Sequence, residues 1–154
     1  MGLADWFNRR IAPSITALGI TPRSVTLEVR GRRSGRPIRF SISPARFEGK
    51  RYLVSLAGER GWVRNARAAD GEAVLIHGRR VPIRLVEIPE EERAPILLAW
   101  VSERAFSRSP KRAARLYFGL ESPTLADMKA LAEKYPVFAI QPRAARAPEQ
   151  SPGT

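Results

Sequence analysis

The sequence predicts one α+β domain in which mostly antiparallel strands form a partly closed β-barrel with flanking helices. Short stretches of alternating apolar and polar residues are separated by turns that contain glycine or proline. Helical patterns fall between these stretches instead of following them as a block. With 154 residues, 44% of them hydrophobic, the chain is long enough for one domain with its own core. A partly closed barrel suits such short strands because closure hides sheet edges.

A predicted amphipathic helix lies within residues 1–20 and stops near Pro13. Its apolar face consists of Leu3, Trp6, Phe7 and Ile11. The helix either docks on its own domain or lies on an anionic membrane surface, which the aromatic face and the neighbouring arginines would suit. The sequence leaves both alternatives open.

Two predicted strand pairs follow this helix. Residues 25–30 and 38–43 alternate apolar and polar side chains, and the stretch RGRRSGRP is the connection between them. A second pair is centred on residues 48–50, with residues 51–55 as its clearer strand. We therefore expect the arginine-rich connection at one end of a sheet.

The remainder of the domain mixes helices and strands. The predicted elements are a loop at 56–60, a helix at 61–69 closed by Asp70 and Gly71, strands at 73–76 and 81–88 around a turn at 78–80, a helix from Pro89 to about Arg104, and a closing strand at 137–140. Thr124 and Asp127 are a capping-box candidate for a helix whose apolar face is Leu125, Met128, Leu131 and Tyr135. The barrel domain is predicted to span residues 21–141, and residues 142–154 are predicted to be a disordered tail.

The composition excludes several kinds of site. The chain has no cysteine and one histidine, so disulfides, thiolate catalysis and histidine-rich metal sites are excluded, and we expect no metal. No apolar stretch is long enough for a membrane span and no signal peptide is evident, which predicts a cytoplasmic protein. The net charge of +12 indicates an acidic partner, which can be nucleic acid, anionic lipid or an anionic cofactor.

The stretch RGRRSGRP is the first candidate binding site. Gly31 and Gly35 allow the backbone to approach a ligand closely, and the Ser34 hydroxyl and nearby amides can donate hydrogen bonds. Arg32 and Arg33 supply forked, charge-assisted hydrogen bonds to phosphate or carboxylate. A solvated basic hairpin explains the same residues equally well.

The segment VSLAGERGWVRNARA, residues 54–68, is the second candidate. A strand ends at Ser55 and a helix begins near Trp62, so the intervening amides would face an anion or a carbonyl-rich ring. In the alternative interpretation Trp62 is a core residue, and Asn65 caps the helix or faces solvent.

The stretches RGRRSGRP, EGKRYLVS and GERGWVRNARA, in this order, resemble the deazaflavin-dependent nitroreductase family, and the similarity runs over residues 25–140. The resemblance implies a split β-barrel, a homodimer, and coenzyme F420, a deazaflavin, in the place that FMN takes in related oxidases. For the phosphate and acidic tail it implies contacts with Arg32, Arg33, Ser34, Ile38, Arg39, Phe40, Ser41, Ile42 and Ser43. For the ring it implies Ser55, Leu56, Ala57, Gly58, Gly61, Trp62, Arg64 and Asn65.

The resemblance implies an oxidoreductase that passes a hydride from the reduced deazaflavin to a small molecule: a quinone, a nitroaromatic compound or an activated enone. The cofactor would carry the chemistry and the protein would supply position and electrostatics. On the substrate side the candidates are Trp100 and Tyr117, whose hydroxyl can donate a hydrogen bond or a proton. Packing between helices is the alternative role for both aromatic residues.

The competing interpretation is a non-catalytic basic module that binds nucleic acid, anionic lipid or another cofactor such as FMN. A barrel that carries a fatty acid is a further variant of it. The sequence lacks the aromatic platform of common single-strand binders, which disfavours nucleic acid.

Overall fold

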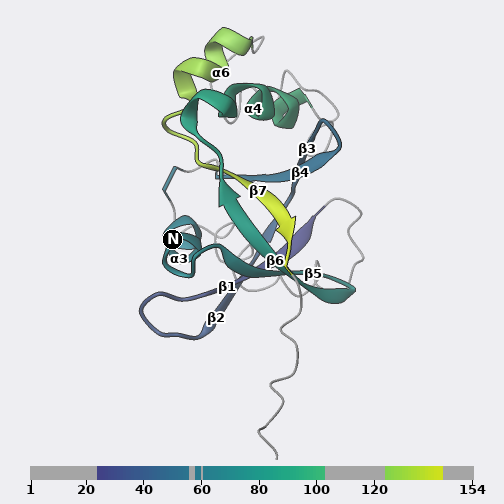
Figure 1. Ribbon diagram of the computed structural model, residues 1–154, viewed down its shortest axis with the longest axis vertical. Coiled ribbons are helices and arrows are strands. Elements are labelled where there is room, and N and C mark those ends of the chain that lie inside the picture. Colours follow the sequence, from purple (N-terminus) through teal and green to yellow (C-terminus); the bar gives the residue numbers. More distant parts are fainter. Residues whose placement is uncertain (1–23, 56–57, 60, 103–123, 144–154) are drawn as a thin grey trace, which may run out of the picture.

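The computed structural model describes residues 24–55, 58–59, 61–102 and 124–143. In this part of the chain seven strands form one sheet in the order β2-β1-β5-β6-β7-β4-β3, and all the paired neighbours are antiparallel. The sheet curls into an open barrel whose two edge strands are β2 and β3 (Figure 1). The predicted α+β class and split-barrel architecture are confirmed.

The first two hairpins lie close to their predicted positions. Strands β1 (Val25–Arg30) and β2 (Pro37–Ile42) pair in the register that places Glu28 opposite Arg39. Strands β3 (Ala45–Phe47) and β4 (Lys50–Val54) are joined by a two-residue turn. Both turn residues have positive φ, 48° at Glu48 and 75° at Gly49. This conformation matches the right-handed twist of the strands that it joins.

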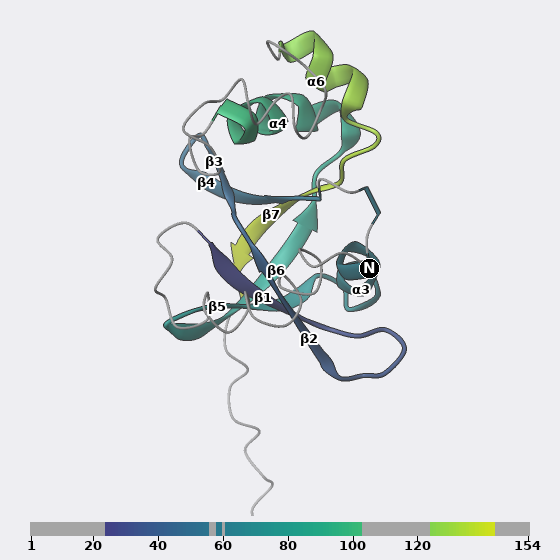
Figure 2. The ribbon, with the colours of Figure 1, turned by 180° about the vertical axis from the view of Figure 1, so that it is seen from behind.

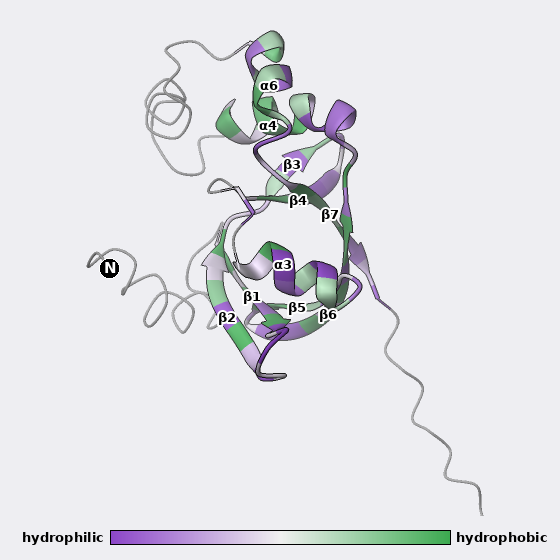
Figure 3. Cartoon of the chain, turned by 90° about the vertical axis from the view of Figure 1, so that its left-hand side faces the viewer, coloured by the Kyte–Doolittle hydropathy of each residue, from purple (hydrophilic) through white to green (hydrophobic). Residues whose placement is uncertain are grey.

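Helix α3 (Gly61–Ala68) lies between β4 and β5 in the sequence and lies across the opening of the curled sheet (Figure 3). Strands β5 (Glu72–His77) and β6 (Arg79–Glu87) follow it. The turn between them is tighter than the sequence predicts, because His77 already pairs with Arg79. Only Gly78, at a φ of 76°, lies between the strands.

A second layer of helices covers one end of the barrel (Figure 1). It consists of a 3-10 turn, η1 (Glu90–Glu92), helix α4 (Arg93–Ser102) and helix α6 (Leu125–Leu131). The predicted capping box of Thr124 and Asp127 is present. The prediction that this helix continues to Tyr135 is wrong: Tyr135 precedes Pro136, whose ring disfavours the helical conformation of the residue before it. Leu125 is exposed and does not join the buried face.

Strand alternation divides the interior into two cores. On β4, Leu53 points into the barrel, whereas Tyr52 and Val54 pack against the helical layer. On the closing strand β7 (Val137–Pro142), Phe138 belongs to the barrel core and Val137 to the helix-covered core. Figure 3 shows apolar residues on the barrel wall and on the helices above it.

Several predictions concern residues that lie outside the described ranges: the amphipathic helix within 1–20, residues 56, 57 and 60 of the loop before α3, Tyr117, and the tail from 144. Strand β7 extends through Pro142, two residues further than the predicted strand. No helix in the described ranges is long and apolar enough to span a membrane.

Candidate functional site

The β1–β2 loop and helix α3 are joined through one buried amide. The Oδ1 atom of Asn65 accepts hydrogen bonds from the Arg32 backbone N–H, at 3.2 Å, and from Arg32 Nη1, at 2.8 Å. Asn65 is only 5% exposed whereas Arg32 is exposed, so a buried acceptor holds an accessible arginine. The structure therefore brings together the two sequence motifs, although these residues lie 33 positions apart.

The loop itself is closed by internal hydrogen bonds. The Gly31 N–H donates to the Arg36 carbonyl at 2.9 Å, and the Gly35 N–H donates to the Gly31 carbonyl at 2.8 Å. The Arg36 N–H donates to the Ser34 hydroxyl oxygen at 3.2 Å. Three of the amides that the sequence suggested for a ligand are thus used within the loop, and the guanidinium groups are its main remaining donors.

The stretch predicted to contact the phosphate and tail divides between the two faces of the sheet. Ile38, Phe40 and Ile42 pair with the barrel-core residues of β1 and lie on the inner face, whereas Arg39 and Ser41 lie on the outer face. The Ser43 hydroxyl lies 3.0 Å from that of Ser24. The six side chains from 38 to 43 therefore cannot all contact one ligand, because successive residues of a strand point in opposite directions.

On the outer face the Glu28 carboxylate holds two arginines. Arg39 Nε donates to Glu28 Oε2 at 2.6 Å, and Arg80 Nη2 donates to Glu28 Oε1 at 2.6 Å. The Glu28 side chain is 9% exposed, and the hydrogen bond from Arg80 is the largest of the effects that lower its pKa below the usual value. Arg39, a predicted cofactor contact, is therefore already paired with a carboxylate that it shares with Arg80.

Ser55, at the end of β4, shapes the loop that follows. Its hydroxyl donates to the Gly58 carbonyl, and its own N–H donates to the Pro136 carbonyl at 2.9 Å. Gly58 has a φ of 72°, which glycine adopts without strain. The Ser55 hydroxyl therefore stabilises the loop, and the predicted ring contacts Leu56 and Ala57 lie outside the described residues.

Trp62 is part of an aromatic row in the barrel. Its ring lies 5.8 Å from the Phe40 ring and 5.4 Å from the Phe138 ring, centroid to centroid. It is only partly buried, and Ile38, on the same inner face of the sheet, is 46% exposed. Gly61 and Arg64 of the same helix are exposed. Trp62 therefore packs against the barrel core, as the alternative interpretation predicted, and part of its surface is open to solvent.

An ion-pair chain that sequence reasoning missed anchors α3. Arg67 Nη1 lies 2.8 Å from Glu59 Oε1, and Arg67 Nη2 lies 2.6 Å from Glu87 Oε1. Arg93 Nη2, at the start of α4, lies 3.5 Å from the same Glu87 oxygen. Hydrogen bonding to Arg67 lowers the pKa of Glu59. No spacing pattern predicts this chain, because its members come from a loop, two helices and a strand.

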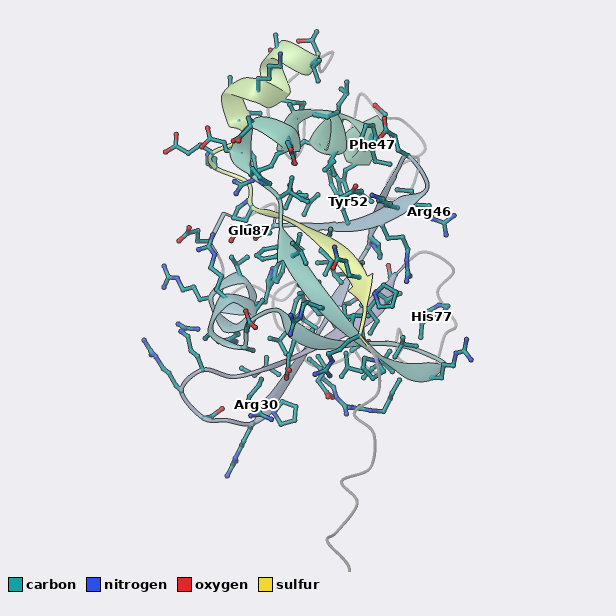
Figure 4. All side chains as sticks on the ribbon, in the orientation of Figure 1. Arg30, Arg46, Phe47, Tyr52, His77 and Glu87 are labelled. Atoms are coloured by element: carbon teal, nitrogen blue, oxygen red, sulfur yellow. The ribbon has the colours of Figure 1, made fainter. Side chains whose placement is uncertain are left out.

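A cavity of about 740 Å³ opens where the β1–β2 loop, the end of α3 and the start of β5 meet. Of the predicted cofactor-binding residues, only Arg32 lines it. Arg30 and Arg143 also line it and were not predicted as site residues. Figure 4 shows Arg30 at this end of the molecule and Arg46 on the distant β3–β4 hairpin.

Trp100, one of the two predicted substrate-side residues, does not line this cavity. Trp100 is 4% exposed and packs in the helix-covered core. Tyr117 lies outside the described residues. Both assignments stay predictions, and the described geometry supplies no contact between Trp100 and the cavity.

Comparisons with known proteins identify the fold. No protein-family model and no curated protein matches the chain. The chain is similar in structure to a protein of unknown function from Agrobacterium tumefaciens, with a TM-score of 0.56 and 14% identity over 86% of this chain and 54% of that one. It is also similar to a heme-binding protein from Mycobacterium smegmatis, with a TM-score of 0.51 and 14% identity over 86% of this chain and 51% of that one.

A third similar structure is a protein from Bacteroides thetaiotaomicron named for a proposed role in resistance to 5-nitroimidazole antibiotics. The TM-score is 0.52 and the identity 10%, over 85% of this chain and 80% of that one. The chain spans about half the length of the first two proteins. At these identities the comparisons establish a shared fold.

Proposed function

We propose that this protein binds coenzyme F420 and catalyses hydride transfer between the deazaflavin and a small electrophile: a quinone, a nitroaromatic compound or an activated enone. The observation that carries the proposal is the contact of Arg32 with Asn65. It joins an arginine-rich loop, suited to a phosphodiester and glutamate carboxylates, to the helix whose first turn borders the predicted ring loop.

The described residues fit the anionic part of this cofactor. In the described part of the chain no ion pair involves Arg30, Arg32, Arg33 or Arg36. Guanidinium groups without a carboxylate partner suit phosphate and carboxylate oxygens. We propose that Arg32 and Arg33 hold the phosphate and acidic tail, and that the exposed side of Ile38 and Trp62 borders the ring.

When bound, the reduced deazaflavin supplies the hydride. The chain's own residues would bind the anionic end and orient the ring against the barrel opening. Holding two reactants at contact distance accounts for a large part of many enzymatic rate enhancements. Nitroaromatic electrophiles are favoured by one comparison, because the similar Bacteroides protein is named for 5-nitroimidazole resistance.

A fluorescence titration tests the proposal. Saturable quenching of oxidised F420 by the purified protein is expected, and Arg32→Ala combined with Arg33→Ala should weaken it by tenfold or more, since about 1.4 kcal/mol corresponds to a factor of ten. Arg46→Ala combined with Arg51→Ala removes the same charge from the β3–β4 hairpin and serves as the control. Saturable binding of FMN without binding of F420 would overturn the cofactor assignment.

Turnover is the second readout. In the presence of menadione or a nitroimidazole, the protein should oxidise reduced F420, which is followed as an increase in absorbance at 420 nm. The variant with both Arg32→Ala and Arg33→Ala should show a raised KM for the cofactor. Steeply salt-dependent binding of DNA or RNA without F420 binding would favour the non-catalytic module instead. A cytoplasmic homodimer remains part of the proposal, and light scattering tests the oligomeric state.

A further inference from the structure

The cavity at the β1–β2 loop has the size of a small-molecule site. Its volume of about 740 Å³ lies within the roughly 300–1,000 Å³ of typical ligand pockets. Glu28 and Arg30 of β1 line it together with Arg32 and other residues of the β1–β2 loop, and the end of α3, the start of β5 and Arg143 form the rest of the lining. The cavity thus combines residues from four separate segments of the chain.

Three carboxylates line the cavity, and each has an arginine partner other than Arg30 and Arg32. Both Glu28 oxygens accept hydrogen bonds from Arg39 and Arg80, which are not lining residues. Glu72 Oε2 lies 3.0 Å from Arg143 Nη1. The third is Asp70, whose side chain is 93% exposed and lies 3.8 Å from Arg84. No carboxylate within the described residues pairs with Arg30 or Arg32.

Arg143 completes the arginine lining without offering a free group to a ligand. Its Nη1 atom lies 3.0 Å from Glu72 Oε2, and its Nε atom is buried away from the cavity space. The cavity therefore presents two guanidinium groups without a carboxylate partner, those of Arg30 and Arg32.

Asn65 holds Arg32 without neutralising it. Its Oδ1 accepts from both the backbone and the guanidinium of Arg32, so it fixes the side chain and leaves the positive charge uncompensated. An aspartate could accept the same two hydrogen bonds but would cancel the charge. Glu28 shows the contrast on the neighbouring strand face, because its carboxylate pairs with both Arg39 and Arg80.

From this geometry we infer that the cavity is a phosphate-binding site in which Arg30 and Arg32 bind the oxyanion and Asn65 positions Arg32. The inference deepens the proposed function. It rests on that function only in taking the bound phosphate to be the phosphate group of F420. Arg30 and the positioning role of Asn65 are additional to the residues implied by the resemblance.

Three variants of the full-length chain with the same net charge test this site. Arg30→Ala and Asn65→Asp each lower the charge at the cavity by one, and Arg51→Ala lowers it by one on the β3–β4 hairpin. Pyrophosphate binding is measured by calorimetry at fixed ionic strength, and F420 binding by fluorescence. We expect Arg30→Ala and Asn65→Asp to weaken both by roughly tenfold, and Arg51→Ala to change neither by more than about twofold.

Asn65→Asp tests whether the uncompensated charge of Arg32 is needed for binding. The aspartate keeps both acceptor contacts and adds a negative charge beside Arg32. If Arg32 binds the oxyanion, pyrophosphate binding weakens at an unchanged Tm, whereas unchanged binding would mean that the contact of Asn65 with Arg32 only joins the loop to α3. If the aspartate variant does not fold, Arg30→Ala, at an exposed position, still tests the cavity.

The outcomes distinguish this inference from the proposed function. If wild-type protein binds F420 but pyrophosphate neither binds saturably nor displaces it, the phosphate site is overturned while the proposed function stands. Equal weakening by Arg51→Ala would also overturn the site, because the binding would then follow net charge alone. If pyrophosphate binds and the variants weaken it as expected, but F420 does not bind, the phosphate site is supported and the assignment of F420 as the cofactor is overturned.

Discussion

Strand β1 carries two charge environments only two residues apart. At Glu28, one carboxylate holds Arg39 and Arg80 with short hydrogen bonds on the outer face of the sheet. At Arg30 and in the loop that follows, the guanidinium groups have no carboxylate partner among the described residues, and Arg32 is held by the neutral Asn65. We call the first the paired end and the second the open end of the hairpin.

The difference shows that net charge alone does not identify a binding surface. The chain has 12 more basic than acidic groups, but several of the described arginines form ion pairs with Glu28, Glu59, Glu72 and Glu87. Arginines with a carboxylate partner stabilise the fold, and binding an external anion would require breaking that pair. Anion binding at the open end breaks no such pair, so we expect an anion to bind there.

The largest predicted effect concerns Gly71, which supports the open end through α3. A Cβ at Gly71 would lie 2.2 Å from the Leu85 carbonyl oxygen, and the φ of 77° disfavours any other residue. Gly71→Ala should therefore lower the free energy of unfolding by roughly 3 kcal/mol or more. Thermal unfolding followed by circular dichroism should show a Tm lower by roughly 10 °C, if the folded state persists.

Gly35 provides the matched control for this substitution. Its φ of 69° is similar, but a Cβ there has no heavy atom within 4 Å. Gly35→Ala should cost only the backbone term, about 1 kcal/mol. Equal losses for both variants would mean that the backbone relaxes at little cost and that the contact of a Cβ at position 71 with Leu85 is not destabilising.

The second prediction removes the carboxylate of the paired end. Glu28→Gln leaves two arginines without their partner, and because these arginines are about half exposed, water can solvate them. We expect a loss of about 1–3 kcal/mol, below the value for a fully buried pair. Chemical denaturation gives the free energy, with Glu72→Gln, at a more exposed ion pair, as the control. A loss as small as that of the control would mean that Glu28 contributes no more than a surface pair.

The pH dependence of this loss follows from the lowered pKa of Glu28. Since the folded state holds the carboxylate ionised to lower pH than the unfolded state does, the contribution is complete above the ordinary pKa of about 4.5 and is lost as pH falls through the folded value. The Tm difference between wild type and Glu28→Gln should be constant from pH 8 to about 5.5 and should shrink in acid. A difference that grows on acidification would contradict the assignment of the shift to Glu28.

Sequence reasoning predicted the strands and α3 well, because alternation and turn residues are local signals. Glu48-Gly49 and Gly78 mark hairpins whose positions depend on nearby residues alone. The side-chain pairing could not be predicted in this way. Arg39 and Arg32 look equivalent in the sequence, and only the register of β1 with β2 and the approach of α3 assign Glu28 to one and Asn65 to the other.

Side-chain direction explains the remaining differences at the candidate site. The resemblance implied ligand contacts for all of residues 38–43, but the strand places Arg39 and Ser41 on the face opposite to Phe40. Arg30 and Arg143 were missed because they meet only when β1 and the end of β7 reach the same cavity.

Capping signals predicted the start of α6, and the proline after Tyr135 was the local signal that its end lay earlier.

The smallest effect is predicted for Arg39→Gln, a substitution at the paired end that can be compared directly with Arg30→Ala at the open end. In Arg39→Gln the Glu28 carboxylate keeps both of its contacts with Arg80, at 2.6 and 3.2 Å. Because Arg39 is itself about half exposed, the loss of stability should stay below about 1 kcal/mol. Pyrophosphate and F420 affinities should change by less than about twofold, whereas Arg30→Ala, with the same charge change, weakens both roughly tenfold. If Arg39→Gln weakens binding as much as Arg30→Ala does, the paired arginine is a ligand contact after all and the two ends of the hairpin form one anion-binding surface.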